Sequence, residues 1–184
     1  MDIEKNIEKS IKKLEFINQW IFNCDTKSSF VLTFLGVIVT IIFTSDIGHD
    51  MIATLHFRCA DHISKSNIRN LISLVCAIAF CVSIIISIYQ LYQTLCGRVN
   101  PIKYEQQGLQ LESNIFFKTI QSRGFSEYEI GPNSENEEQY LNDLNSQIYI
   151  NSKIVESKFK HYNNSLKAIL YGFGSFLFFV LLNS

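Results

Sequence analysis

The 184-residue sequence lacks the marks of several functional classes. Its net charge is −1, whereas a nucleic-acid-binding surface needs a basic excess, so nucleic acid is not an expected partner. The sequence has no glycine-rich phosphate loop, no H-E-x-x-H metal motif and no nucleophile elbow, and no pair of carboxylates stands out as catalytic. We therefore expect no enzyme activity, no catalytic residues and no cofactor.

Cysteine and histidine are too sparsely spaced to predict a disulfide framework or a metal site. The five cysteines, at positions 24, 59, 76, 81 and 96, include no C-x-x-C pair, and two of them lie inside an apolar run. Free cysteine behaves there as a small hydrophobe, so we expect no structural disulfide and no thiolate metal site. His49, His56 and His62 are compatible with metal capture, but exposed loop histidines are the simpler interpretation, and no metal is predicted.

Charge is absent from three long stretches, residues 28–45, 70–97 and 168–184. A bilayer core about 30 Å thick needs roughly 20 apolar helical residues, with a working range of about 17 to 25, so each run can cross it. A soluble chain of this length could not cover three helices that are apolar on all sides. We do not expect a cleaved signal peptide, because the first run begins only at residue 28, behind several acids, and no small-residue cleavage site follows it.

These runs predict an all-α membrane protein, with three transmembrane helices and a cytoplasmic helical stalk and sensor region. Lys and Arg are enriched before the first run and between the second and third, so the positive-inside rule places those segments, and the N-terminus, in the cytoplasm and the C-terminus in the periplasm. The predicted order is a cytoplasmic amphipathic helix over 1–27, a first span over 28–45, a periplasmic loop over 46–69, a second span over 70–97, a cytoplasmic helical sensor and stalk over 98–167, and a third span over 168–184.

Two apolar stripes connect the cytoplasmic segments to the spans. Apolar residues recur at steps of three and four over residues 3–23, which predicts an amphipathic helix that continues into the first span. A second stripe follows the capping box of Ser134 and Glu137 and predicts one helix from residue 135 to residue 182. The stripes must bury against each other or against copies of themselves, so we expect a mechanical link between cytoplasm and membrane.

An ionic collar, Asp25 and Lys27, directly precedes the first run. It is either a generic interfacial collar, with the Lys27 ammonium reaching back to the headgroups, or a gating or assembly ion pair. In both interpretations Asp25 can pair with Lys27 or with a neighbouring cytoplasmic helix.

A short amphipathic helix is expected over residues 111–129, where aromatic residues cluster with Lys118 and Arg123. Most such aromatics form core. The alternative is a ligand pocket, in which aromatic rings stack on a base and a cation holds a phosphate.

Small residues four apart mark one face of each of the first two spans and allow close helix contact. Contacts within one chain and contacts between copies are both compatible with these stripes, which are Gly36, Thr40 and Thr44 in the first span and Ala79, Ser83 and Ser87 in the second.

Three segments resemble the transmembrane Pycsar effector family. The opening segment FINQWIFNCDTKSSFVLTFLGVIV shows an amphipathic helix, a D-x-K-small-small collar and an apolar run containing glycine. SNIFFKTIQSRGFSEYE is similar to the middle motif, an aromatic pair followed by a helix and an E-Y element, and LNSQIYINSKIVESKFKHYNNSLKAIL resembles the terminal Q-I…I…K helix. The residues that carry the resemblance are Asp25, Lys27, Ser28, Ser29, Gly36, Phe116, Phe117, Glu127, Tyr128, Gln147, Ile148, Ile154 and Lys158.

The resemblance implies an abortive-infection effector of bacterial antiphage defence in the inner membrane. A partner cyclase, with which no direct contact is needed, would make a cyclic pyrimidine mononucleotide, cyclic CMP or cyclic UMP, and the effector would sense it and impair membrane integrity. As a hypothesis, Phe117 or Tyr128 stacks on the base and Lys118 or Arg123 holds the phosphate. The expected partners are this ligand, the lipid bilayer and further copies of the chain. The alternatives are a ligand-independent pore-forming toxin and a structural membrane adaptor.

Overall fold

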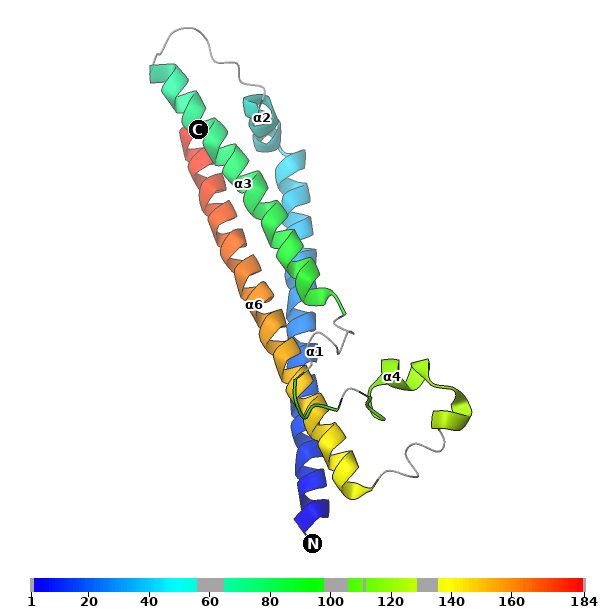
Figure 1. The fold of residues 1–184 in the computed structure, drawn as a ribbon. Coiled ribbons are helices and arrows are strands. Elements are labelled where there is room, and N and C mark those ends of the chain that lie inside the picture. Colours follow the sequence, from blue (N-terminus) through cyan, green and yellow to red (C-terminus); the bar gives the residue numbers. More distant parts are fainter. Residues whose placement is uncertain (1, 56–64, 98–105, 111, 129–135, 184) are drawn as a thin grey trace. The chain divides into compact units, whose positions relative to one another are not determined.

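The computed structural model describes residues 2–55, 65–97, 106–110, 112–128 and 136–183 (Figure 1). All regular secondary structure in these ranges is helical, which confirms the all-α prediction. The main helices are α1 (Asp2–Thr44), α2 (Asp46–Leu55), α3 (Lys65–Leu95), α4 (Phe117–Ser122) and α6 (Glu137–Asn183). Among the described residues, α1, α3 and α6 are the helices long and apolar enough to cross a membrane, as predicted.

The chain divides into two compact units. Unit 1 comprises Met1–Asp25 and Cys96–Lys158, and unit 2 comprises Thr26–Leu95 and Phe159–Ser184. Helices α1 and α6 are each continuous from unit 1 into unit 2, as the two apolar stripes predicted.

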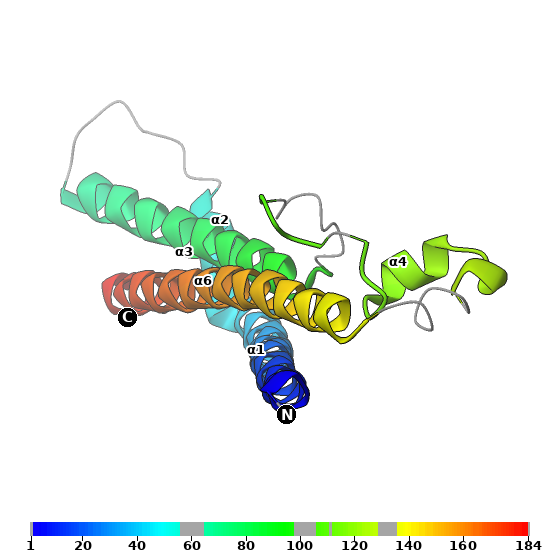
Figure 2. The same cartoon turned by 60° about the horizontal axis from the view of Figure 1, so that its bottom comes forward.

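Unit 2 is built on α3 running antiparallel to the second half of α6 (Figures 1 and 2). Contacts between the two helices fix this direction, because the residue numbers rise along α3 as they fall along α6. The contacts are a hydrogen bond of 3.2 Å from Asn183 Nδ2 to Ser73 Oγ, the rings of Phe80 and Phe176 at 5.3 Å, and His161 Nδ1 at 2.6 Å from Gln90 Oε1. The buried core around them is apolar and includes Leu35, Ile42, Met51, Ala77, Phe80, Ile84, Leu91 and Phe179.

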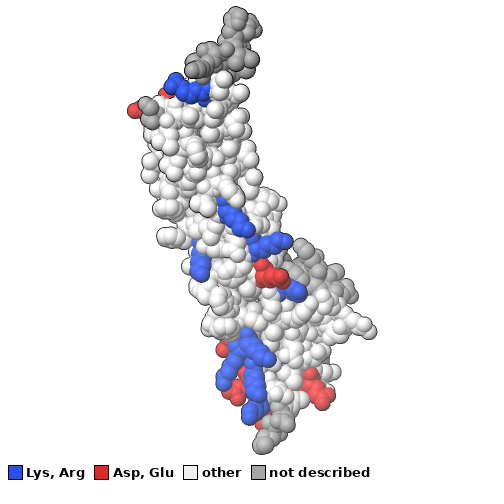
Figure 3. All heavy atoms as spheres, turned by 90° about the vertical axis from the view of Figure 1, so that its left-hand side faces the viewer, with Lys and Arg blue, Asp and Glu red and all other residues white. Residues whose placement is uncertain are grey.

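The outer surface of unit 2 suits lipid. Large apolar side chains such as Phe30, Phe34 and Ile85 are exposed on it, and Figure 3 shows a broad band of uncharged surface on one face of the molecule. Hydroxyl groups on this surface are satisfied inside their own helix, since Thr40 Oγ1 donates to the carbonyl of Gly36 at 2.9 Å. Thr33, Thr44 and Ser175 make the same i−4 bond, so these side chains present no unpaired hydroxyl to hydrocarbon.

The two small-residue stripes have different environments. On α3, Ser83 faces Gly172 of α6 so closely that a Cβ added at Gly172 would lie 3.2 Å from the Ser83 Cβ. This stripe therefore packs within the chain. On α1, Gly36, Thr40 and Thr44 are exposed, and a Cβ at Gly36 would meet nothing within 4 Å.

Helix α2 was not predicted, because residues 46–69 were expected to form a loop. It begins after a sharp corner in which Ser45 Oγ donates to the carbonyl of Ile42 at 2.6 Å. Gly48 is required at this corner, since a Cβ there would lie 2.3 Å from the Ile42 carbonyl oxygen. The acidic Asp46 in the first turn also favours a helix start. Of the three histidines in this segment, only His49 lies within the described residues.

Helix α6 begins two residues later than the predicted capping box would place it. Asn136 is the capping residue: Gln139 N–H donates to Asn136 Oδ1 at 2.8 Å, and Asn136 N–H donates to Gln139 Oε1 at 3.1 Å. This is a reciprocal capping box with amides in both roles. Ser134, the predicted cap, lies outside the described residues.

A buried carboxylate anchors the loop before α4 to α6 within unit 1. Asp143 is fully buried, and its Oδ2 accepts hydrogen bonds from Ser113 Oγ at 3.0 Å and from the Asn114 N–H at 2.8 Å. Ser113 Oγ in turn accepts the N–H groups of Ile115 and Phe116, both at 3.0 Å. These bonds hold the start of the aromatic segment, so α4 is shorter than the helix predicted over 111–129.

The contact at Gly172 predicts a site that does not tolerate a large side chain. Gly172→Leu should destabilise the protein by about 1–3 kcal/mol, because the added side chain overpacks the helix contact. Thermal unfolding in detergent measures the effect. Gly174→Leu is the matched control, since a Cβ at Gly174 meets nothing within 4 Å. Equal melting temperatures for the two variants would contradict the α3–α6 contact.

If Asp143 anchors the loop before α4, its replacement should reduce the protection of the loop backbone from hydrogen exchange. Asp143→Ala should leave a buried donor unsatisfied, cost about 1–3 kcal/mol and speed hydrogen exchange at the Asn114 amide. Glu138→Ala, at an exposed acid on the same helix, is the control. If exchange at residues 113–116 is the same in both variants, the carboxylate is not the anchor.

Candidate functional site

Unit 1 is held by a polar seam between α1 and α6. Three hydrogen-bonded pairs make up the seam: Ser10 with Asn145 at 3.1 Å, Asn18 with Asn151 at 2.9 Å, and Asp25 with Lys158 at 2.6 Å. The residue numbers rise together on both helices, so α1 and α6 run parallel here. The steps are six to eight residues, close to two helical turns, which keeps every pair on the same face. The two stripes thus pack against each other within one chain.

The last pair of the seam is an ion pair at the residues where unit 1 ends on both helices. The Lys158 ammonium donates to Asp25 Oδ1, and its side chain is only 5% exposed, against 36% for Asp25. Asp25 therefore pairs with the neighbouring helix, one of the two predicted alternatives. Lys27 is exposed.

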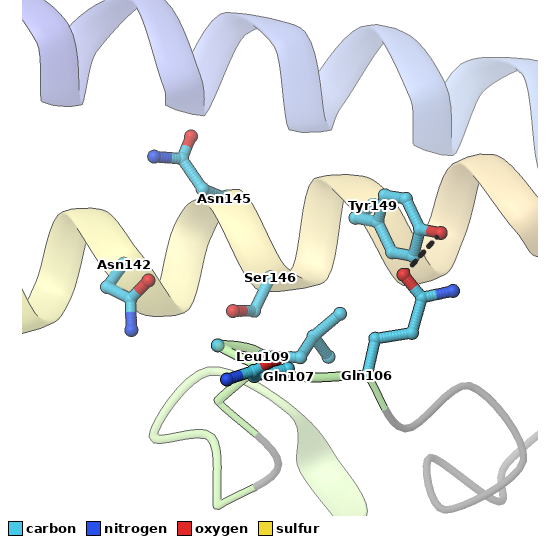
Figure 4. A pocket seen from close by; sticks show the side chains of 8 residues that line it. Gln106, Gln107, Leu109, Asn142, Asn145, Ser146 and Tyr149 are labelled. Atoms are coloured by element: carbon cyan, nitrogen blue, oxygen red, sulfur yellow. Dashed lines mark hydrogen bonds between the residues drawn. The ribbon is translucent and has the colours of Figure 1, made fainter.

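A polar pocket lies in unit 1 between the turn at residues 106–109 and one face of α6 (Figure 4). Its volume is about 200 Å³, and it is open to solvent on one side. The α6 residues that line it are Asn142, Asn145, Ser146 and Tyr149. The turn is shaped by Gly108, whose φ of +86° is a left-handed conformation that favours glycine.

A second hollow in unit 1 is apolar. It has a volume of about 460 Å³ and is lined by Lys12, Lys13, Phe16, Ile17 and Ile148. Lys12 donates to Glu8 at 2.6 Å, and this contact holds the pKa of the Glu8 carboxyl below its ordinary value. The walls offer hydrocarbon rather than hydrogen bonds, so this hollow suits packing side chains better than a polar ligand.

The four residues predicted to contact a ligand lie on α4 and on the residues that follow it. We call residues 117–128 the α4 segment. None of the four is among the residues that line the polar pocket. Phe117 is 64% exposed, and its ring lies 4.9 Å from that of Phe116. Lys118 is exposed, whereas the Arg123 guanidinium donates to Asn114 Oδ1 in the loop before α4. Tyr128 is half-buried on the following helical turn.

The amide-rich lining of the pocket was missed at the sequence level. The signal was present, because the polar residues Asn142, Asn145, Ser146 and Tyr149 recur at steps of one, three and four on the predicted helix. Lys158 was also not identified as the partner of Asp25. It lies four residues after the buried Ile154, on the face where the stripe predicts an apolar residue.

No group of His, Cys, Asp and Glu that could hold a metal ion occurs within the described residues. The four cysteines that the structure describes, at positions 24, 76, 81 and 96, are free thiols.

Comparison with known proteins gives the family. The Pycsar effector protein domain, PycTM, matches residues 10–183. The Pycsar effector protein GmPycTM of Gulbenkiania mobilis is 32% identical over 181 residues, which cover 96% of this chain and 90% of that protein. No solved structure matches the chain. Because the match takes in all three long apolar helices and both sides of the polar seam, the chain belongs to the transmembrane Pycsar effector family.

Proposed function

We propose that this Pycsar effector of antiphage defence binds a cyclic pyrimidine mononucleotide, cyclic CMP or cyclic UMP, and then impairs the integrity of the bacterial inner membrane. Effectors of this family respond to cyclic pyrimidine nucleotides made by a cyclase and are generally not enzymes. The observation that carries the proposal is the family match over residues 10–183, which includes three helices able to span a bilayer.

In this proposal unit 1 is the cytoplasmic sensor and unit 2 the membrane part. The Lys and Arg distribution supports a cytoplasmic N-terminus, a cytoplasmic segment 98–167 and a periplasmic C-terminus. The exposed stripe of Gly36, Thr40 and Thr44 supports association of several copies in the membrane, since small residues let helices approach closely. The effector needs no contact with its cyclase, because the nucleotide diffuses between them.

The signal would travel along continuous helices. A ligand that prefers one arrangement of α1 and α6 in unit 1 shifts the population toward that arrangement. Neither helix is interrupted between the seam and the apolar segment, so a change in the seam moves backbone that is covalently part of the spans. Asp25 and Lys158 act in this proposal as the coupling pair.

The ligand contacts predicted from the sequence remain a hypothesis within this proposal. Phe117 and Lys118 are both exposed and so are available to a base and a phosphate. Arg123 would first have to release Asn114. Tyr128 would stack from the neighbouring turn.

The function predicts ligand-dependent leakage. Liposomes of bacterial lipid that contain the protein and a trapped dye should release the dye with cyclic CMP or cyclic UMP, and not with cyclic AMP or cyclic GMP. Release without any nucleotide would instead support a ligand-independent pore-forming toxin. Absence of release with every nucleotide, together with a co-purifying protein, would support a structural adaptor.

The coupling pair predicts separable binding and leakage. Asp25→Lys should leave the buried Lys158 ammonium facing a like charge, lower stability by about 1–3 kcal/mol and abolish triggered dye release, while nucleotide binding persists. The double variant Asp25→Lys with Lys158→Asp should restore release, because it restores opposite charges.

Exchange of an exposed pair on the same helix provides the control. Glu8 and Lys12 are paired at 2.6 Å but are 66% and 70% exposed, so Glu8→Lys with Lys12→Glu should leave release unchanged. Full release by the single Asp25→Lys variant would show that the pair does not couple the two units.

A further inference from the structure

The polar pocket of unit 1 is rich in carboxamides. Four of its eight lining residues carry this group, and no lining side chain carries a charge. The four are Gln106, Gln107, Asn142 and Asn145. A carboxamide places donors and an acceptor side by side, so it pairs well with a ring edge that also presents both. A pocket of this kind recognises a neutral heterocycle better than an ion.

Hydrogen bonds hold the pocket walls in place. The Tyr149 hydroxyl donates to Gln106 Oε1 at 2.9 Å, the bond drawn in Figure 4, and ties the turn to α6. The Gln110 N–H donates to the buried Ser146 Oγ at 3.0 Å and fixes the other end of the turn. Such pre-organisation lowers the entropy cost of binding. The Gln107 and Asn142 side chains are exposed at the pocket. Asn142 Nδ2 donates a long hydrogen bond of 3.4 Å to Gln110 Oε1, which leaves Asn142 Oδ1 and the second N–H for a ligand.

The size of the pocket limits the ligand. Its volume of about 200 Å³ is below the range of roughly 300–1,000 Å³ for drug-sized ligands. The pocket can therefore admit one pyrimidine ring but cannot enclose a whole cyclic dinucleotide. The half-buried Tyr149 supplies an aromatic wall against which a base can stack. The Lys153 ammonium lies 5.7 Å from the centroid of the same ring and 4.0 Å from Glu156 Oε2. Both side chains of this ion pair are exposed, so the pair is weak and the ammonium can turn to a phosphate beside the pocket.

We propose that this pocket reads the base edge of the cyclic pyrimidine mononucleotide, with Gln107 and Asn142 pairing to the ring and Lys153 attracting the single phosphate charge. The inference rests on the proposed function, which names the ligand class, and assigns it a site other than Phe117, Lys118, Arg123 and Tyr128. The chemistry is the pairing of Asn and Gln amides with base edges that present both a donor and an acceptor.

Replacing an amide by the isosteric carboxylate tests directly whether Gln107 and Asn142 recognise the base. Glutamate and aspartate only accept hydrogen bonds. At ring position 4 they pair with the N4 amine of cytosine and repel the O4 oxygen of uracil, whereas at position 3 they pair with the N3–H of uracil and repel the bare N3 of cytosine. Gln107→Glu and Asn142→Asp should therefore change the ratio of cyclic CMP affinity to cyclic UMP affinity by roughly tenfold, upward for a side chain that faces position 4 and downward for one that faces position 3. Both nucleotides carry the same charge, so general repulsion by the new carboxylate cancels in this ratio.

The measurement is calorimetric titration of the full-length protein in detergent with cyclic CMP and cyclic UMP. Gln121→Glu is the matched control, because Gln121 is an exposed amide on α4 that does not line the pocket. It should keep the wild-type ratio. Lys153→Ala should weaken both nucleotides by the same factor, since a phosphate contact carries no base information.

The outcomes separate this inference from the function on which it rests. A wild-type protein that binds a pyrimidine nucleotide and leaks dye, with unchanged ratios in both pocket variants, overturns the pocket and leaves the function standing. If only Lys118→Ala loses nucleotide binding, the pocket is also overturned while the function stands, and the ligand site lies on the α4 segment. A wild-type protein that binds neither nucleotide overturns the function and the pocket together.

Discussion

The structure depends on the parallel contact between α1 and α6 in unit 1. Amphipathic helices can slide along or rotate about each other when their shared face is purely apolar. Three polar pairs at steps near two turns remove that freedom, because a shift of one turn would break all of them. The Asp25–Lys158 pair is the most demanding of the three, since an ammonium that is 5% exposed requires its counter-charge.

Unit 2 obeys a different constraint. Hydrocarbon offers no hydrogen-bond partner, so a polar group in a membrane span is stabilised by a partner within its own helix or on another helix. The hydroxyls of Thr40, Thr44 and Ser175 bond to the preceding turn, and Asn183 Nδ2 donates to both Ser73 Oγ and the Phe179 carbonyl. The buried hydroxyls of Ser28 and Ser87 are exceptions, with no hydrogen-bond partner among the described residues. Close approach of the helices then depends on small residues, as at Gly172, where an added Cβ would lie 3.2 Å from the Ser83 Cβ. Polar pairs therefore fix the helix contact in unit 1, whereas small side chains allow the close helix contact in unit 2.

The helices could be predicted from the sequence because periodicity and the absence of charge act locally. The long α6 and the continuity of α1 with the first span follow from apolar steps of three and four. The capping residue was misplaced because Asn136 and Gln139 replace the Ser and Glu of the usual box. The choice of Lys158 as the partner of Asp25, and the turn at residues 106–109 that completes the polar pocket, could not be predicted, because only the tertiary fold brings these residues together.

The seam also has a consequence for biosynthesis. Its partners lie 133 to 135 residues apart in sequence, so each pair joins the first helix to the last. A ribosome-bound chain that has already inserted α1 and α3 still lacks the second half of every pair. Unit 1 therefore forms only once translation of α6 is well advanced, and a partly made chain has no assembled α1–α6 contact.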